Sequence, residues 1–289
     1  MRERDFLQVD VFADRPGAGN GLAVVLDADG LDAGTMQRFA HWTNLSETSF
    51  VLPPTAPGAS YRVRIFTPRS ELPFAGHPSV GTAHALLDSG RVVAVDGRLV
   101  QECAAGLLPI EVVGAGKAQV VSVRAPRARV LDVDADTTSI ARGCVAGLPP
   151  GAIGPHLVDN GPRFWCIEIA SEAAVRGMVP DLPAITTLME STHSVGLAVF
   201  ARDGSGGLVV RVFCPADGIP EDPVTGAANA AIAGLLEARG ALGDLGRRYR
   251  VSQGREVGRD GRIDVHVDAQ GDAWIGGTSR TVIRGTLAW

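Results

Sequence analysis

The sequence has few aromatic and few charged residues. In a chain of 289 residues, 5% are aromatic, 20% are charged and the formal net charge is −5. A chain without a basic excess does not release counterions from nucleic acid, so nucleic-acid binding is not expected. The sequence also lacks an apolar run of about 18 residues and an apolar N-terminal signal segment. We therefore expect a cytoplasmic protein without a membrane partner.

Cysteine is scarce as well, and its spacing does not suit a metal site. The four cysteines are Cys103, Cys144, Cys166 and Cys214. They form no CxxC pair, and no histidine cluster at metal-ligand spacing accompanies them. We expect reduced, buried thiols and no bound metal.

A glycine-rich loop at residues 17–21 lacks the pattern of a nucleotide-binding loop. Leu22 occupies the third glycine position of that pattern, and the following segment is typical of a strand rather than a helix. We therefore expect no dinucleotide cofactor. Asn20, inside the loop, is interpreted as a polar residue of the active site or of a turn.

Glycine and alanine are abundant, and part of their excess lies in an internal repeat. Residues 61–90 and 208–240 each contain Arg, a β-branched residue, Phe, any residue and Pro. Both then contain a polar residue, Pro, two residues, Gly, one residue and Ala. This second pattern begins at His77 in the first copy and at Asp222 in the second. The shared order predicts a duplication that produced two similar halves.

Each copy of the repeat predicts a strand followed by a central helix. The helices are expected to begin at Pro78 and Pro223, because proline suits the first helical position. Neither helix has a charged face, which predicts burial on all sides inside a wrapped sheet. Strands are predicted at 22–26, 49–52, 61–66, 107–113, 120–123, 165–169, 196–200, 208–213, 249–252, 262–267 and 282–287, and a further helix at 32–42.

These elements predict two domains with the boundary near Gly116. The N-terminal domain is expected to span residues 1–116, with residues 280–289 returning to complete its sheet. The C-terminal domain is expected to span residues 117–279, and the active site to lie in the cleft between the two.

His77 and Asp222 hold the same position in the repeat, directly before the proline. Asp222 is either the N-cap of its helix or a site residue. His77 is not a favoured N-cap and loses hydration among apolar residues, so it is either a buried structural histidine or a site residue. Two helix N-termini that meet in one cleft would offer free N–H groups to a small carboxylate. Gly76, Gly81 and Gly226 would allow the backbone to approach that ligand closely.

Glu47 is the third candidate. Alternation in the strand that it enters places its side chain on the same face as Leu45 and Val51. A carboxyl group on an apolar face has a raised pKa, in the range useful for general acid–base catalysis. The alternative is an exposed glutamate at the end of a strand.

The chain resembles the PhzF-like family of phenazine-biosynthesis isomerases, a branch of the diaminopimelate epimerase fold. The resemblance lies in five segments in family order: GAGNGLAVV (17–25), NLSETSF (44–50), ELPFAGHPSVGTA (71–83), EDPVTGAAN (221–229) and QGREVGR (253–259). It implies an α+β fold of two pseudo-symmetric domains, each a mainly antiparallel β-roll wrapped around a central α-helix. It also implies a homodimer.

The resemblance assigns roles residue by residue. Glu47 matches the catalytic acid/base, His77 the histidine of GHP, and Asp222 the aspartate of EDP. Gly76 and Gly226 match glycines whose backbone N–H groups lie at the bound substrate. The implied reaction is the cofactor-free isomerisation of trans-2,3-dihydro-3-hydroxyanthranilate, in which one carboxyl group removes a proton from one carbon and a proton returns at another.

Two departures from the family pattern bear on the substrate. Ala227, expected at the substrate, stands where many members have serine, so a hydroxyl group is absent there. Gly21 stands where many members have proline, which loosens the loop at Asn20.

Three functions stay open. The first is a cofactor-independent isomerase of a small carboxylated metabolite, and the second is an amino- or imino-acid racemase or epimerase. The third is a non-catalytic metabolite-binding protein. Racemases of this fold use paired thiols at the two helix starts, where this chain has His77 and Asp222 instead, and Cys214 lies before the turn. A two-thiol mechanism is therefore disfavoured.

Overall fold

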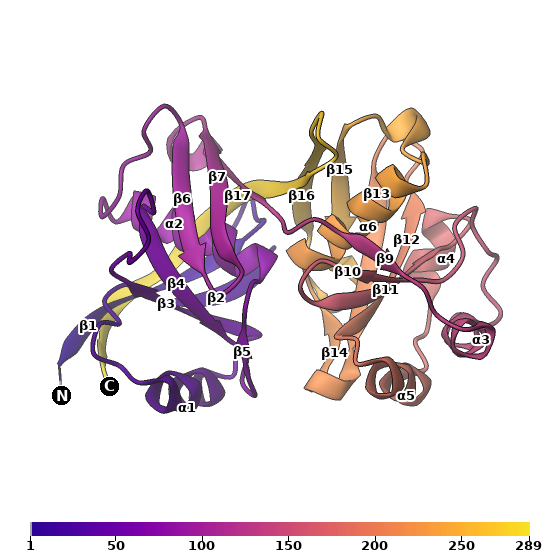
Figure 1. Ribbon diagram of the computed structural model, residues 1–289, viewed down its shortest axis with the longest axis horizontal. Coiled ribbons are helices and arrows are strands. Elements are labelled where there is room, and N and C mark those ends of the chain that lie inside the picture. Colours follow the sequence, from indigo (N-terminus) through magenta and orange to yellow (C-terminus); the bar gives the residue numbers. More distant parts are fainter. Residues whose placement is uncertain (1) are drawn as a thin grey trace. The chain divides into compact units, whose positions relative to one another are not determined.

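The computed structural model describes residues 2–289, which form a mixed α/β fold of two compact units (Figure 1). Unit 1 runs to Arg124 and includes Gly276–Trp289, and unit 2 is Ala125–Ile275. The division falls after a strand at Val120–Arg124 that pairs with the strand before it, whereas the sequence places the boundary ahead of that strand.

The elements of unit 1 are β1 (Glu3–Val11), β2 (Asn20–Val25), α1 (Ala33–Thr43), β3 (Glu47–Leu52), β4 (Tyr61–Phe66), β5 (Glu71–Leu72), α2 (Gly76–Asp88), β6 (Arg98–Cys103), β7 (Gly106–Val113), the 3₁₀ helix η1 (Gly116–Ala118), β8 (Val120–Arg124) and most of β17 (Ala273–Ala288). The elements of unit 2 are β9 (Arg129–Leu131), α3 (Ala135–Gly143), β10 (His156–Asp159), β11 (Arg163–Glu168), α4 (Glu172–Gly177), α5 (Leu182–Thr192), β12 (Gly196–Arg202), β13 (Leu208–Cys214), η2 (Pro215–Asp217), β14 (Ile219–Asp222), α6 (Gly226–Ala238), η3 (Gly243–Leu245), β15 (Arg248–Gln253), η4 (Arg255–Val257) and β16 (Gly261–Val267).

The strands of both units pair in the same order. In unit 1, β1–β2, β3–β4, β4–β5 and β6–β7 are antiparallel, while β2–β3 and β4–β6 are parallel. In unit 2, β10–β11, β12–β13, β13–β14 and β15–β16 are antiparallel, while β11–β12 and β13–β15 are parallel. Each predicted strand lies within or overlaps one of these elements.

The C-terminal segment pairs with the first strand of the chain. β17 lies antiparallel to β1 from the Glu3–Ala288 pair to the Val11–Ser279 pair. In Figure 1 the yellow end of the chain runs along the indigo first strand, and the two termini lie close together. Residues 280–289 therefore extend the sheet of unit 1, because β17 supplies the second neighbour of β1.

The Arg-x-Phe motif of the repeat has the same structural role in both units. The guanidinium group of Arg64 pairs with Glu71 at 2.7 Å, and its Cζ lies 5.2 Å from the centre of the Phe66 ring. Arg211 pairs with Glu221 at 2.7 Å and lies 5.0 Å from the centre of the Phe213 ring. In each unit one arginine thus fastens the short strand (β5 or β14) to the longer one.

The two central helices are buried on all sides, as predicted. α2 is buried from Gly76 to Leu86 and contacts β1, β2, β3 and β8, while α6 is buried from Gly226 to Ala233 and contacts β9, β10, β11 and β16. The predicted helix starts are wrong. α2 begins two residues before Pro78, which lies in its first turn, where the missing N–H costs no hydrogen bond. α6 begins three residues after Pro223.

Two expectations concern the membrane and the thiols. Within residues 2–289, no helix is both long and apolar enough to cross a bilayer. The four cysteines form no disulfide in the described chain, and Cys144, Cys166 and Cys214 are buried, while Cys103 is half-buried.

Candidate active site

Glu47, His77 and Asn20 lie together in unit 1. Oε2 of Glu47 is 3.4 Å from Nε2 of His77, and Nδ2 of Asn20 is 3.5 Å from Nδ1 of the same imidazole. The His77 side chain is only 4% exposed and that of Glu47 16% exposed, so the glutamate is not the exposed residue of the alternative interpretation. Sequence reasoning named all three residues but not their mutual contacts.

A fourth residue, Ser46, sets the orientation of this cluster. Its hydroxyl donates to Oδ1 of Asn20 at 3.1 Å, which directs the amide nitrogen of Asn20 toward His77. An amide N–H donor facing Nδ1 makes that nitrogen the acceptor, so the neutral imidazole carries its proton on Nε2. Nε2 is also the ring atom that lies 3.4 Å from Oε2 of Glu47.

The parallel pairing of β2 and β3 explains why these residues meet. Asn20 is the first residue of β2 and Glu47 the first of β3, and parallel neighbours begin at the same edge of a sheet. α2 begins at this edge, with Gly76 as its first residue and His77 as its second.

The loop before Asn20 is held by a buried carboxylate that sequence reasoning missed. Asp10 accepts the backbone N–H groups of Ala18 at 3.0 Å and of Gly19 at 3.1 Å. A Cβ atom at Gly19 would lie 2.0 Å from the carbonyl oxygen of Val11, so only glycine fits there. The loop leads into strand β2 and not into a helix, as the sequence predicts.

In unit 2, Asp222 belongs to a buried polar network. Its carboxylate accepts from the Thr225 hydroxyl at 2.5 Å. Gln253 connects the network, because its amide nitrogen donates to the Asp222 carbonyl at 3.0 Å and to the Thr225 hydroxyl at 2.9 Å. Its amide oxygen accepts from Thr225 N at 3.1 Å and from Nδ2 of Asn229 at 3.0 Å. This network fixes the turn between β14 and α6.

Asp222 is not the N-cap of α6, which corrects one interpretation of the sequence. The N-cap is Thr225, whose side chain makes no capping bond to the helix among the described residues. The N-cap of α2, Ala75, has no polar side chain to make one. By contrast, side chains cap α1, α3, α4 and α5, namely Asp32, Asp134, Ser171 and Asp181. The two central helices thus keep the uncapped N-termini that suit binding of a carboxylate.

The structure aligns the two copies of the repeat differently from the sequence motif. α2 and α6 both have 13 residues, and they begin at Gly76 and Gly226, so Gly76 corresponds to Gly226 and His77 to Ala227. His77 and Asp222 therefore do not hold equivalent positions, because Asp222 ends strand β14, before the helix. Matching the two prolines misaligned the copies, since only one of them lies within its helix.

Each unit has an asparagine that contacts the second residue of its central helix. Asn20 contacts the second residue of α2, His77, and Asn160 donates to the carbonyl oxygen of the second residue of α6, Ala227, at 2.9 Å. Each asparagine precedes a glycine, Gly21 or Gly161. The repeated Asn-Gly pair is the sequence signal that would have identified Asn160.

Gly81 is explained by packing. It lies in the buried second turn of α2, where a Cβ atom would be 2.6 Å from Cγ2 of Val11 and 2.7 Å from Cδ2 of Leu22. Its absent side chain lets α2 lie close to β1 and β2, and its contact with a substrate stays a prediction.

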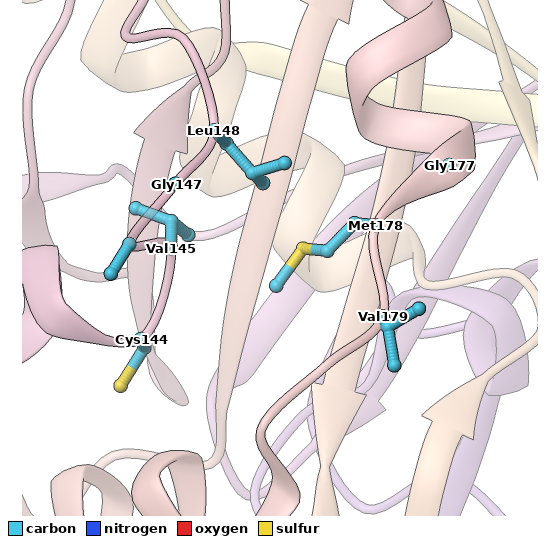
Figure 2. Close-up of a pocket in the computed structure, with 8 residues that line it drawn as sticks. Cys144, Val145, Gly147, Leu148, Gly177, Met178 and Val179 are labelled. Atoms are coloured by element: carbon cyan, nitrogen blue, oxygen red, sulfur yellow. The ribbon is translucent and has the colours of Figure 1, made fainter.

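Unit 2 also has a hollow of about 240 Å³ lined by apolar side chains and by glycines. Figure 2 shows its two walls, one bearing Cys144, Val145 and Leu148 and the other Met178 and Val179. Burial raises the pKa of the Cys144 thiol to about 11, so the thiol is protonated near neutral pH. The hollow has no side chain suited to binding a carboxylate.

No group of three histidine, cysteine, aspartate or glutamate side chains in residues 2–289 could hold a metal ion. The site itself places a carboxyl group beside an imidazole, next to an uncapped helix N-terminus.

Comparison with known proteins identifies the family. The profile of the phenazine biosynthesis-like protein family, PhzC-PhzF, matches residues 9–286, and the chain belongs to this family. It is 33% identical over 289 residues to trans-2,3-dihydro-3-hydroxyanthranilate isomerase of Pseudomonas chlororaphis, with 98% of each chain covered. It is also 32% identical over 294 residues to Antisense-enhancing sequence 1 of Schizosaccharomyces pombe, with 99% of each covered. The first of these relatives is named an isomerase, and the chain is assigned to the isomerases on that similarity.

Solved structures agree with the family. The phenazine biosynthesis protein of the PhzF family from Bacillus anthracis superposes with a TM-score of 0.83 at 26% identity, and all of both chains is covered. A hydroxyproline epimerase from Agrobacterium vitis superposes with a TM-score of 0.70 at 15% identity, which shows a shared fold.

Proposed function

We propose that the chain is a cofactor-independent isomerase that moves a proton on a small carboxylated metabolite. The observation that carries this proposal is the placement of Glu47 against His77 at the uncapped start of α2. A helix N-terminus attracts the carboxylate of a substrate, and a half-buried carboxyl group beside it is placed to exchange a proton.

In the proposed reaction, the Glu47 carboxylate removes a proton from one carbon of the substrate. The electron pair of the broken C–H bond moves along the adjacent conjugated system, and the proton returns from the Glu47 carboxyl group to another carbon. Atoms and charge balance without an external oxidant or reductant. The Nε2 proton of His77 stabilises the carboxylate form of Glu47, and Asn20 holds the imidazole in that tautomer.

We assign the start of α6 to the same reaction. Asp222, Gly226 and Ala227 at the helix start are the candidate substrate-binding residues of unit 2, and the network around Gln253 holds Asp222 in place. Ala227 supplies only its backbone, because its side chain carries no hydroxyl group.

For the substrate, we propose trans-2,3-dihydro-3-hydroxyanthranilate or a related small carboxylate. The relative in Pseudomonas chlororaphis is named for this compound and shares 33% of its residues with the chain. The departures at Ala227 and Gly21 favour testing a panel of carboxylates rather than one compound.

The test is proton exchange in D₂O. Wild type is expected to incorporate deuterium into trans-2,3-dihydro-3-hydroxyanthranilate or another carboxylate of the panel, detected by mass spectrometry. Glu47→Gln is expected to lower that rate about 10³-fold, as is usual for loss of a general acid–base group, with an unchanged thermal unfolding midpoint.

Glu111→Gln is the matched control, because it makes the same change on β7 of the same unit and should exchange as wild type does. Exchange by Glu47→Gln at the wild-type rate would refute the mechanism. Exchange of no panel member by wild type would favour a metabolite-binding protein. Deuterium at the same carbon with inversion of its configuration would instead identify a racemase or epimerase.

We also propose the finer architecture that the resemblance implies. The identical pairing order, the two central helices of 13 residues and the paired Arg-x-Phe motifs support two β-roll domains that arose by duplication. A homodimer and a cytoplasmic location stay predictions, which analytical ultracentrifugation and cell fractionation would check.

A further inference from the structure

A polar cavity of about 470 Å³ lies at the C-terminal end of α2 in unit 1. Its walls come from α2, from η1 and from β17, and they include His84, Lys117, Arg280 and Arg284. His84 follows His77 by seven residues on the same helix, which places it about 10 Å further along the axis at 1.5 Å per residue. The cavity is thus separate from the cluster around Glu47.

The charge of this cavity is positive. Three of its lining residues, Lys117, Arg280 and Arg284, are cationic, and Asp88 is the one carboxylate among those lining residues. Asp88 accepts from both Arg284 and Thr281, so its charge is already offset. Two positive charges remain without a carboxylate in the cavity.

One of these charges, Lys117, stands out in the sequence. It is the single lysine of a chain whose other basic residues are arginines. Within residues 2–289, its amine makes no hydrogen bond or ion pair. An ammonium group with three donors in the lining of a cavity is therefore available to a ligand.

Arg280 is held in place for such a ligand. Its Nε donates to the carbonyl oxygen of Asp14 and its Nη1 to that of Ser279, both at 3.0 Å. These bonds fix the plane of the guanidinium group and leave Nη2 for a further acceptor. The buried hydroxyl of Ser279 also lines this region and has no partner among the described residues.

We propose that this cavity binds a small oxyanion that carries two negative charges, such as a phosphate group or a dicarboxylate. A dianion would neutralise the two unpaired cations and accept from the Lys117 amine and the Arg280 guanidinium group. The volume fits a ligand of metabolite size. This proposal does not depend on the reaction assigned to Glu47.

The single lysine makes the test specific. Reductive methylation with ¹³C-formaldehyde labels Lys117 and the N-terminal amine, and Lys117→Arg identifies which NMR signal belongs to the lysine. Titration with inorganic phosphate or with malonate, at constant ionic strength, is expected to move the Lys117 signal along a saturating curve. Chloride at the same ionic strength is expected to leave it in place. If only one of the two dianions gives a saturating curve, that dianion shows whether the cavity prefers a phosphate group or a dicarboxylate.

Variants then locate the site. Arg280→Ala is expected to raise the dissociation constant at least about tenfold, because it removes a charge-assisted hydrogen bond to the dianion. Asp88→Asn is expected to lower the dissociation constant, because it removes a negative charge from the cavity. Arg38→Ala on α1, which removes an exposed arginine that does not line the cavity, is expected to change the constant less than about twofold.

A linear shift without saturation, or equal affinity in Arg280→Ala, would overturn the proposal. If Arg280→Ala does not fold, Lys117→Gln keeps the test intact, because the lysine amine makes no contact in the described chain. Calorimetry should then show binding at least about fivefold weaker than in wild type. Unchanged affinity in Lys117→Gln would refute the site equally.

Discussion

At the scale of single residues, each unit buries one glutamine that reaches the first turns of its central helix. Gln101 on β6 accepts from the Tyr61 hydroxyl at 3.1 Å and donates to the Ser79 hydroxyl at 2.9 Å. Gln253 on β15 makes four bonds, to Asp222, Thr225 and Asn229. Both glutamines are 0% exposed, so a lost bond cannot be replaced by water. They bind the start of each helix to a strand of its own unit.

Replacement of these glutamines by leucine should destabilise the protein unequally. Gln253→Leu leaves buried donors of Thr225 and Asn229 without acceptors and should lower the free energy of unfolding by about 3 kcal/mol. Gln101→Leu breaks fewer bonds and should cost about 1–2 kcal/mol. Urea denaturation of both variants measures the difference, and equal losses would contradict the importance given to the Gln253 network.

At the scale of elements, the central helices are narrow because their neighbours leave no room for side chains. In α2 the Cβ position of Gly81 is blocked by Val11 of β1 and Leu22 of β2. In α6 the Cβ position of Gly234 would lie 2.4 Å from the Cβ of Ala128. The glycine and alanine content thus reflects helices enclosed by strands, as the low charge of both helices predicts.

Substitution of glycine by alanine separates packing from helix propensity. Alanine is favoured over glycine in a helix by about 1 kcal/mol, yet the contacts at 2.6 and 2.7 Å should make Gly81→Ala destabilising by about 1–3 kcal/mol. Gly143 ends α3 and has no atom within 4 Å of its Cβ position, so Gly143→Ala should be neutral or slightly stabilising. Thermal unfolding compares the two, and a stabilised Gly81→Ala would show that α2 can move away from its strands.

At the scale of the whole molecule, the free energy of unfolding should decrease in two steps as the pH is lowered. Burial lowers the pKa of His84 from its ordinary value of 6.5, against the opposing effect of Asp88. A histidine with a lowered pKa in the folded state binds more protons when unfolded, so its contribution is lost as the pH falls below 6.5. Hydrogen bonds from Thr35 and Thr137 lower the pKa of the helix caps Asp32 and Asp134 below 3.8, and their contribution is lost as the pH falls further.

The two steps are distinguishable by mutation. The free energy of unfolding, measured in urea from pH 7.5 to pH 3, should fall less steeply between about pH 6.5 and 5 in His84→Gln than in wild type. Asp32→Asn combined with Asp134→Asn should flatten the decline below about pH 4 and leave the upper step unchanged. A wild-type slope in His84→Gln above pH 5 would contradict the role of the buried imidazole.

The predicted strands and the charge-free helices were recoverable from the sequence, because alternation and apolar composition are local signals. Glu47, His77 and Asn20 were also recoverable, since they lie in the segments that carry the family resemblance. Gln253 was not, because its contacts are with residues distant in the chain. Asp10 was not, because its role depends on how the following loop folds back on β1. Asn160 was missed, although the repeated Asn-Gly pair could have identified it. The predicted equivalence of His77 and Asp222 is wrong, because a proline is as common in a turn as in the first turn of a helix.

By itself, the sequence determined the family, the repeated strand–helix pattern and the chemical types present at the site. These follow from residue order and from periodicity, which depend on near neighbours along the chain. The tertiary structure decided where each helix begins, which residues of the two central helices correspond, and that Ser46, Asn20, His77 and Glu47 lie together. It also placed the single lysine and Arg280 in the lining of one cavity. Those facts depend on the pairing of distant strands, and a local pattern of residues does not specify that pairing.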